Sequence, residues 1–165
     1  MKQILIPALL LGCFLITGCY AIHGDVYSIN EIALSSQFNG TYIPKREDGS
    51  DDKSIYIVRT ISNGYIIDFM ENNKPESKES IFGQIFKVGE IHYLQLIDEK
   101  GGKELFKVLM VADGGVKLFR LSEIKLKTLK IDSGKMIEAK VIRDLINSNA
   151  DIYDENPLTL LKITR

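Results

Sequence analysis

Between residues 38 and 121, short runs of hydrophobic and β-branched residues alternate with turn signals. KSIYIVRTI (53–61) and YIIDFME (65–71) are two such runs, and each has the length and composition of one strand. Strands that follow one another through tight turns form antiparallel hairpins. The pattern therefore predicts a mainly β fold with one C-terminal helix, in which an antiparallel meander forms a small barrel or a sandwich.

The first turn predicts a specific pairing of charges. Asn63-Gly64 is a strong hairpin signal, because a type I′ turn needs two residues that tolerate a positive φ. A two-residue loop at this position would place Arg59 opposite Asp68 on the neighbouring strand. Opposite charges that face each other in this way stabilise the register of a hairpin.

Two further hairpins are expected. Gly89-Glu90 suits a type II′ turn, which takes glycine at its first position. Asp113-Gly114 is the expected two-residue turn of the third hairpin. Residues 101–102 join these two hairpins within a longer loop, because a two-residue turn there would place two glutamates opposite each other.

The hydrophobic periodicity changes near the carboxyl terminus. In SGKMIEAKVIRDLINSN (133–149) the apolar residues recur at helical spacing. Asp132 or Ser133 can cap the start of this helix, and residues 147–149 can end it. A last strand is expected in NPLTLLKITR (156–165). The apolar stripe of the helix consists of Ile137, Val141, Ile142, Leu145 and Ile146.

The second and third hairpins carry apolar residues on both faces, although a single core uses only one face of a strand. The helix can cover part of the other face. The remainder is interpreted either as a patch that docks a protein or a lipid chain, or as crossed sheets with scattered exposed side chains. In the second hairpin the two faces are Ile81, Ile85, Leu94 and Leu96, against Phe82, Phe86, Val88, Ile91, Tyr93 and Ile97. In the third they are Leu105, Leu109 and Leu118, against Phe106, Val108, Met110 and Phe119.

The segment FNGTYI (38–43) lies at the start of the first expected strand. Gly40, Thr41 and Tyr42 resemble the glycine-x-aromatic start of the first strand in lipocalin-like barrels, with Tyr42 where lipocalins usually carry tryptophan. The resemblance implies a small lipocalin-like barrel, and it implies no particular ligand.

The amino-terminal residues have the pattern of a targeting segment. Lys2 is followed by an uncharged run that reaches Ile16-Thr17-Gly18-Cys19. These four residues resemble the lipobox of bacterial lipoproteins, which implies that the Cys19 thiol receives a diacylglyceryl group and that the chain is cleaved before it. The alternative is an uncleaved signal anchor, whose helix would contain unfavourable proline and glycine residues.

The resemblance divides the chain into three parts: a lipoprotein signal peptide (1–18), a lipid-anchored tether (19–37) and a single β-rich globular domain (38–165). Several acyl chains on one cysteine hold a protein stably on a membrane, so the membrane is an expected partner through Cys19. Tyr20 is not the aspartate that retains such lipoproteins in the inner membrane. The expected location is therefore the bacterial cell envelope, at the outer membrane, on its periplasmic face or at the surface.

Composition limits the possible partners and the sources of stability. Residues 19–165 contain 20 basic and 22 acidic residues, a net charge of −2 that indicates no nucleic-acid-binding surface. Cys13 lies in the expected signal peptide, so the mature chain has no thiol besides that of Cys19. The fold must therefore be stabilised by its hydrophobic core and not by disulfides.

Residue types that carry catalysis are scarce in this chain. His23 lies beside the tether, and His92 is expected on a strand surface opposite Lys87, whereas zinc sites and catalytic triads gather several such residues. The acidic segments 48–52 and 151–155 lack the spacing of an EF-hand loop and are interpreted as solvated loops. We therefore expect no enzyme activity, no catalytic residue, no metal and no cofactor.

Three functions are compatible with these observations. The favoured one is a non-enzymatic binding or scaffolding module for another envelope protein, which the apolar strand faces suggest. The second is a carrier of a small apolar ligand in a lipocalin-like barrel. The third is a hydrolase whose site the sequence does not reveal. The sequence leaves the oligomeric state open.

Overall fold

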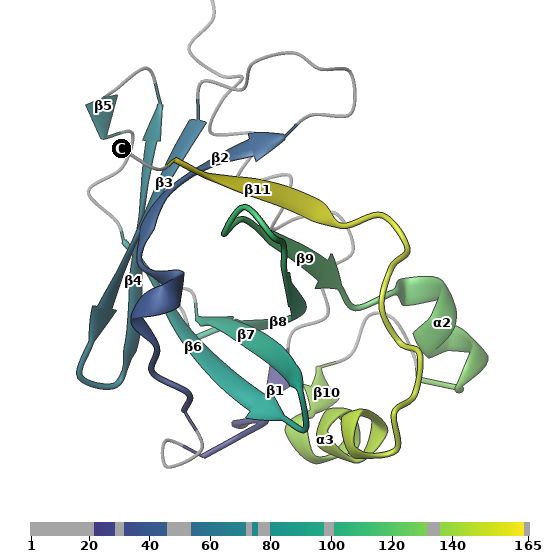
Figure 1. The fold of residues 1–165 in the computed structure, drawn as a ribbon. Helices are drawn as coiled ribbons and strands as arrows, with labels where there is room; N and C mark the ends of the chain where they lie inside the picture. Colours follow the sequence, from purple (N-terminus) through teal and green to yellow (C-terminus); the bar gives the residue numbers. More distant parts are fainter. Residues whose placement is uncertain are drawn as a thin grey trace, which may run out of the picture.

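The computed structural model describes residues 22–28, 32–45, 54–71, 74–75, 80–97, 101–131 and 136–163. Its main feature is a closed antiparallel barrel of eight strands (Figure 1). Each strand pairs with the next barrel strand along the chain, and the last pairs with the first. The strands are β2 (Gly40–Lys45), β3 (Ser54–Ile61), β4 (Gly64–Glu71), β6 (Ile81–Val88), β7 (Ile91–Ile97), β8 (Lys103–Met110), β9 (Val116–Arg120) and β11 (Leu158–Ile163).

Shorter elements surround the barrel. The 3₁₀ helix η2 (Ser36–Phe38) precedes β2, and β5 (Lys74–Pro75) pairs with β4. β1 (Ile22–His23) pairs in parallel with β10 (Ile137–Glu138). Along the chain, the helices α2 (Glu123–Thr128) and α3 (Ala139–Asn147) come after β9 and before β11. In space, α3 lies beside β10 outside the barrel (Figure 1). Among the described residues, no helix has the length and apolar character needed to cross a membrane.

The expected mainly β fold is confirmed, and it is a small lipocalin-like barrel and not a sandwich. The second hairpin has the predicted register, with Val88 paired to Ile91. Gly89 has φ +58°, as the first position of a type II′ turn requires. The longer loop expected at 101–102 is also confirmed, because Ile97 pairs with Lys103.

The predicted register of the first hairpin is wrong by two residues. Ile61 pairs with Gly64, so the loop consists of residues 62–63, and Gly64 already belongs to β4. A Cβ atom on Gly64 would lie 2.5 Å from the carbonyl oxygen of Gly83, so this glycine allows β6 to approach. A shift of two residues keeps every side chain on its expected face. Arg59 therefore still forms an ion pair with Asp68, but diagonally, because its direct partner is Ile66.

The third hairpin differs from the prediction by one residue. Its loop is residues 111–115, in which the backbone amide of Val111 donates a hydrogen bond to the Gly115 carbonyl oxygen over 3.0 Å. Val108 consequently pairs with Leu118 instead of Phe119. Because side chains alternate along a strand, this shift moves Leu118 into the barrel and Phe119 to its outer face.

The helix near the carboxyl terminus begins later than predicted. α3 starts at Ala139, because Ile137 pairs with Ile22 in a two-residue strand. The expected caps, Asp132 and Ser133, lie outside the described residues. The predicted end at 147–149 and the last strand are confirmed. The buried side chains of α3 are Ala139, Ile142 and Ile146, whereas Val141, which was expected in the stripe, is 40% exposed.

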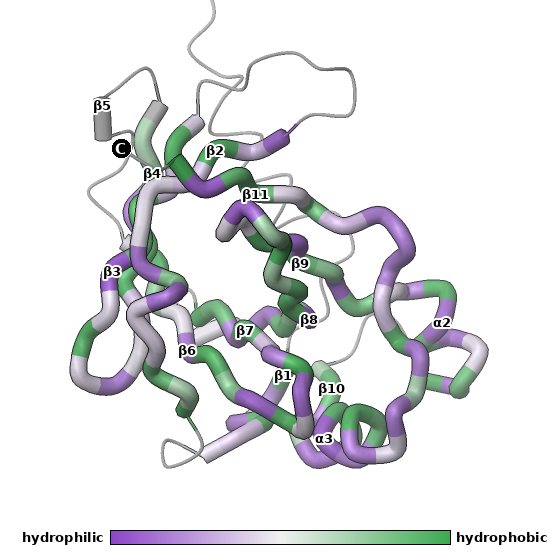
Figure 2. The backbone as a smooth tube through the Cα atoms, viewed as in Figure 1, coloured by the Kyte–Doolittle hydropathy of each residue, from purple (hydrophilic) through white to green (hydrophobic). Residues whose placement is uncertain are grey.

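The buried apolar side chains form two separate cores. Along the barrel strands, hydrophobic and hydrophilic stretches of the backbone follow one another (Figure 2). The inner core fills part of the barrel and includes Phe38, which η2 places at one end. The outer core lies between the outer face of β6, β7 and β8 and the segments that cover it. Those segments are residues 22–28, which were expected to belong to the tether, together with α2, β10, α3 and residues 152–153.

Candidate binding cavity

The barrel interior contains a cavity of about 130 Å³. Its wall consists mainly of aliphatic and aromatic side chains from all eight barrel strands and from η2. An eight-stranded barrel has an interior that side chains nearly fill or that holds one small ligand. The lining residues are Phe38, Tyr42, Tyr56, Val58, Tyr65, Ile67, Ile81, Ile85, Leu94, Leu96, Glu104, Phe106, Val108, Val116, Leu118, Leu158 and Leu160.

One end of the barrel is closed by the segment that precedes β2. Phe38 is buried there, and the Tyr42 hydroxyl donates a hydrogen bond to its carbonyl oxygen over 2.9 Å. The Tyr65 hydroxyl accepts a hydrogen bond from the Ser35 amide over 2.8 Å. Lys162 Nζ donates to the carbonyl oxygen of Gln37 over 2.8 Å. Hydrogen bonds from three strands therefore hold this segment across the barrel end.

The two tyrosine hydroxyls at the closed end stay protonated at neutral pH. Burial raises the pKa of Tyr42 to about 12, and the neighbouring Tyr65 adds to the shift. Burial also raises the pKa of Tyr65, although the hydrogen bond with Ser35 opposes this. Both hydroxyls therefore act as structural hydrogen-bonding groups and not as bases.

His92 lies at the same end of the barrel. It pairs with Lys87, as predicted, but its side chain is half-buried and its ring centroid lies 5.5 Å from that of Phe38. His92 was expected on a strand surface, and its half-buried imidazole instead packs against Phe38. Burial lowers the pKa of its imidazole, and the positive charge of Lys87 lowers it further. A neutral imidazole against an aromatic ring serves packing at this position.

Glu104 lines the other end of the cavity, near the start of β8. Its side chain is half-buried, and its cross-strand neighbour is Leu96. Among the described lining residues Glu104 carries the single charged group, since the others are apolar residues or tyrosines. This end of the wall also contains Ile81 and Leu158, which begin their strands.

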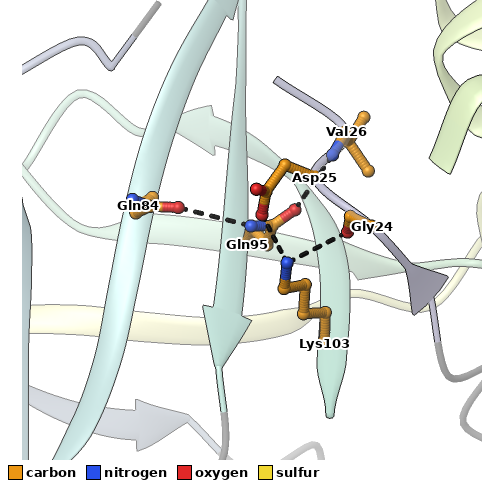
Figure 3. Close-up of polar contacts among 6 residues, drawn as sticks. All are labelled: Gly24, Asp25, Val26, Gln84, Gln95 and Lys103. Atoms are coloured by element: carbon orange, nitrogen blue, oxygen red, sulfur yellow. Dashed lines mark hydrogen bonds and ion pairs between the residues drawn. The ribbon is translucent and has the colours of Figure 1, made fainter. Parts of the chain in front are cut away.

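A polar contact network fastens the amino-terminal segment to the outside of the barrel (Figure 3). Gln95 is fully buried; it accepts a hydrogen bond from the Val26 amide over 3.5 Å and donates one to Gln84 over 3.3 Å. Lys103 Nζ donates to the Gly24 carbonyl oxygen over 3.1 Å and forms an ion pair with Asp25. Side chains of β7 and β8 therefore hold the segment in one position against the sheet.

The other predicted site residues do not converge. Cys19 and residues 48–52 lie outside the described residues, and His23 is exposed in β1. Asp151 forms an ion pair with Lys125 over 2.8 Å, and this hydrogen bond lowers the pKa of its carboxyl group. Within the described ranges, no group of three or more histidine, cysteine, aspartate or glutamate side chains could hold a metal ion.

The sequence pattern predicted part of the cavity wall but did not indicate its charged residue. Ile81, Ile85, Leu94 and Leu96 were predicted to share one face, and all four line the cavity. Glu104 was not expected to face the barrel interior, because it comes directly before an apolar run. Its separation from Phe106 by two residues was the available signal, since alternate residues of a strand share a face.

Comparisons with protein-family models, with curated proteins and with solved structures find no match for this chain. The pairing of the strands alone defines the barrel.

Proposed function

We propose that the protein binds a small apolar molecule in the barrel cavity and does so as a lipid-anchored protein of the bacterial cell envelope. The supporting observation is a cavity of about 130 Å³ with an almost entirely apolar wall. Its size is close to that of an engineered cavity of ~150 Å³ that stays dry and binds benzene. A ligand part with five or six carbon atoms matches this space, and the proposal involves no catalytic step.

The size of the cavity limits the affinity. Very small ligands gain at most about 1.5 kcal/mol per non-hydrogen atom, so a six-atom ligand binds with a Kd no lower than roughly 0.3 micromolar. Such an affinity suits reversible uptake and release. It also requires titrations in the micromolar to millimolar range of ligand concentration.

The anchor would hold the barrel close to the membrane. Ile22 is only 2% exposed and belongs to the outer core, and two residues separate it from Cys19. An extended chain spans at most ~3.6 Å per residue, so an acylated Cys19 lies within about 11 Å of Ile22. A membrane is therefore the nearest reservoir of apolar ligand for this barrel.

A ligand titration tests the cavity. The protein used comprises residues 20–165, which retain every strand and both cores. We expect 1-pentanol to shift the NMR signals of the inner core and to bind more weakly to Val58→Phe, whose ring enters the cavity. Val141→Phe, at an exposed site on α3, is the matched control and should bind like the wild type. Equal binding by all three proteins would contradict a site inside the barrel.

A second experiment tests the anchor. Cells grown with an alkyne-bearing fatty acid should label the full-length wild-type protein and leave Cys19→Ser unlabelled, because the thiol is the acceptor of the diacylglyceryl group. A His23→Gln variant should be labelled like the wild type. Label retained in Cys19→Ser would exclude Cys19 as the site of acylation.

A second candidate function is a scaffolding contact with another envelope protein. It is favoured by exposed apolar side chains beside the outer core, namely Ile124 at 77% and Met136 at 59% exposure. Most of the outer sheet face, which the sequence suggested as a docking patch, is covered by the chain itself. A photo-crosslinker placed at Met136 in intact cells should capture one protein reproducibly if this contact exists.

A further inference from the structure

Glu104 differs from every other residue of the cavity wall in its chemistry. Its half-buried side chain, which ends in a carboxylate, lines a space that is otherwise bounded by aliphatic and aromatic groups. A carboxylate that is partly removed from water loses favourable solvation, and an opposite charge or a hydrogen-bond donor can restore it. A partner for this group within the cavity would therefore be bound favourably.

Three nearby polar groups do not supply that partner. The hydroxyls of Tyr42 and Tyr65 are committed to the segment that closes the far end. Lys103 precedes Glu104 in β8, but it points to the outer face, where it binds Gly24 and Asp25. Within the described part of the chain, the Glu104 side chain makes no hydrogen bond or ion pair of its own.

The position of Glu104 separates the cavity into an apolar end and a charged end. Phe38, Tyr42 and Val116 line the closed end, whereas Glu104 lies where β8 begins. A ligand with an apolar tail and a polar head can place its tail at the closed end. Its head then lies beside the carboxylate.

We propose that Glu104 selects the ligand class: a short hydrocarbon chain or ring that ends in a protonated amine, or more weakly in a neutral hydrogen-bond donor. This inference rests on the proposed function, because it concerns the same cavity. A protonated amine pairs with the carboxylate through a charge-assisted hydrogen bond. A ligand carboxylate would instead place two like charges together, which disfavours binding.

The test compares three ligands of equal chain length at neutral pH: pentylamine, 1-pentanol and pentanoate. Binding is measured by calorimetry or NMR titration with the protein comprising residues 20–165. Hydrogen bonds to charged groups are stronger than those between neutral groups, so the wild type should bind pentylamine at least ~tenfold more tightly than pentanoate. In Glu104→Gln this preference should fall to about threefold or less, while 1-pentanol binding changes little.

The control variant is Glu90→Gln. Glu90 lies in the turn between β6 and β7, at the opposite end of the barrel, and its side chain is 94% exposed. The Glu90→Gln substitution removes one negative charge, as Glu104→Gln does, but it lies outside the cavity. The preference for pentylamine should therefore remain. A preference reduced equally by both variants would reveal a general charge effect and overturn the role of Glu104.

The remaining outcomes separate the two proposals. If pentanol binds but pentanoate binds as tightly as pentylamine, the cavity is a binding site and the inference about Glu104 is overturned. If none of the three ligands binds the wild type, the proposed function fails, and the inference fails with it. The wild-type series decides between these results even if Glu104→Gln does not fold.

Discussion

The inner and outer cores have similar compositions but different packing. Both consist mainly of isoleucine, leucine, valine, phenylalanine and tyrosine side chains. The outer core is covered by segments from both ends of the described chain, and Val26, Ile142 and Ile152 are fully buried in it. The inner core is enclosed by the barrel strands, with η2 at one end, and retains a cavity of about 130 Å³.

The difference follows from the geometry of the two enclosures. Helices and loops can move toward a sheet until their side chains fill the space between them. The radius of a closed barrel is set by its strand number and stagger, so its wall cannot collapse onto a void. The molecule therefore separates two roles: the outer core provides tight packing, and the inner core provides space for a ligand.

The largest effect is expected from a truncation in the outer core. Ile142→Ala should lower the free energy of unfolding by about 2–5 kcal/mol, because a fully buried side chain leaves a new cavity. Val141→Ala, at the neighbouring exposed position of α3, should change it by less than about 0.5 kcal/mol. Urea denaturation of both variants measures the contrast. Equal effects would mean that α3 does not pack as described.

Adding one methylene group should change the free energy of unfolding in opposite directions in the two cores. Val26→Leu overfills the outer core and should cost about 1–3 kcal/mol. Val58→Leu extends into the inner cavity and should be neutral or stabilising by up to about 1 kcal/mol. The midpoints of urea denaturation report both changes. A large loss of stability in Val58→Leu would argue against a void beside that residue.

Two tyrosine hydroxyls provide a finer comparison. Tyr153, in the outer core, has a buried hydroxyl without a hydrogen-bond partner among the described residues, whereas the Tyr42 hydroxyl binds the Phe38 carbonyl. Tyr153→Phe should therefore be neutral or stabilising by about 1 kcal/mol, and Tyr42→Phe should destabilise by about 1 kcal/mol. Thermal unfolding compares the two variants. Matching losses of stability would indicate that the Tyr153 hydroxyl has a partner after all.

The smallest effect is expected outside both cores. The Arg59 guanidinium and the Asp68 carboxylate form an ion pair on the barrel surface, with 64% and 28% of their side chains exposed. Exposed pairs contribute about 0.2–1 kcal/mol, so a double-mutant cycle with alanine should give a small favourable coupling. A coupling of zero within error would mean that the diagonal contact does not persist in solution.

The sequence predicted most of the strands because their patterns are local. The second hairpin was predicted residue for residue, since Gly89-Glu90 alone determines its register. The observed registers of the first and third hairpins differ from the predicted ones. Gly64 and Gly115 make close contacts with other strands, and local turn rules do not include such contacts. A Cβ atom on Gly115 would lie 2.6 Å from the Leu160 carbonyl oxygen, and Leu160 is 45 residues away in the sequence.

The candidate site was harder to predict for the same reason. The apolar face of β6 and β7 was visible in the alternation of residues, but its meaning depended on what lay opposite it. Whether such a face is filled or left hollow depends on barrel closure by β2 and β11, which are separated by more than a hundred residues. The position of residues 22–28 was hard to predict for a similar reason. This segment has no strong sequence pattern of its own, and hydrogen bonds from Gln95 and Lys103 hold it against the barrel.

The central claim is that the barrel contains an accessible apolar void and that the described residues of the outer core enclose none. Xenon binds in dry apolar cavities, and its electron density locates them directly. A crystal of the protein comprising residues 20–165, pressurised with xenon, should show a xenon atom inside the barrel among Leu94, Phe106 and Leu118, and none beside Ile142. A barrel interior without xenon, or xenon beside Ile142 in place of the barrel, would contradict the account.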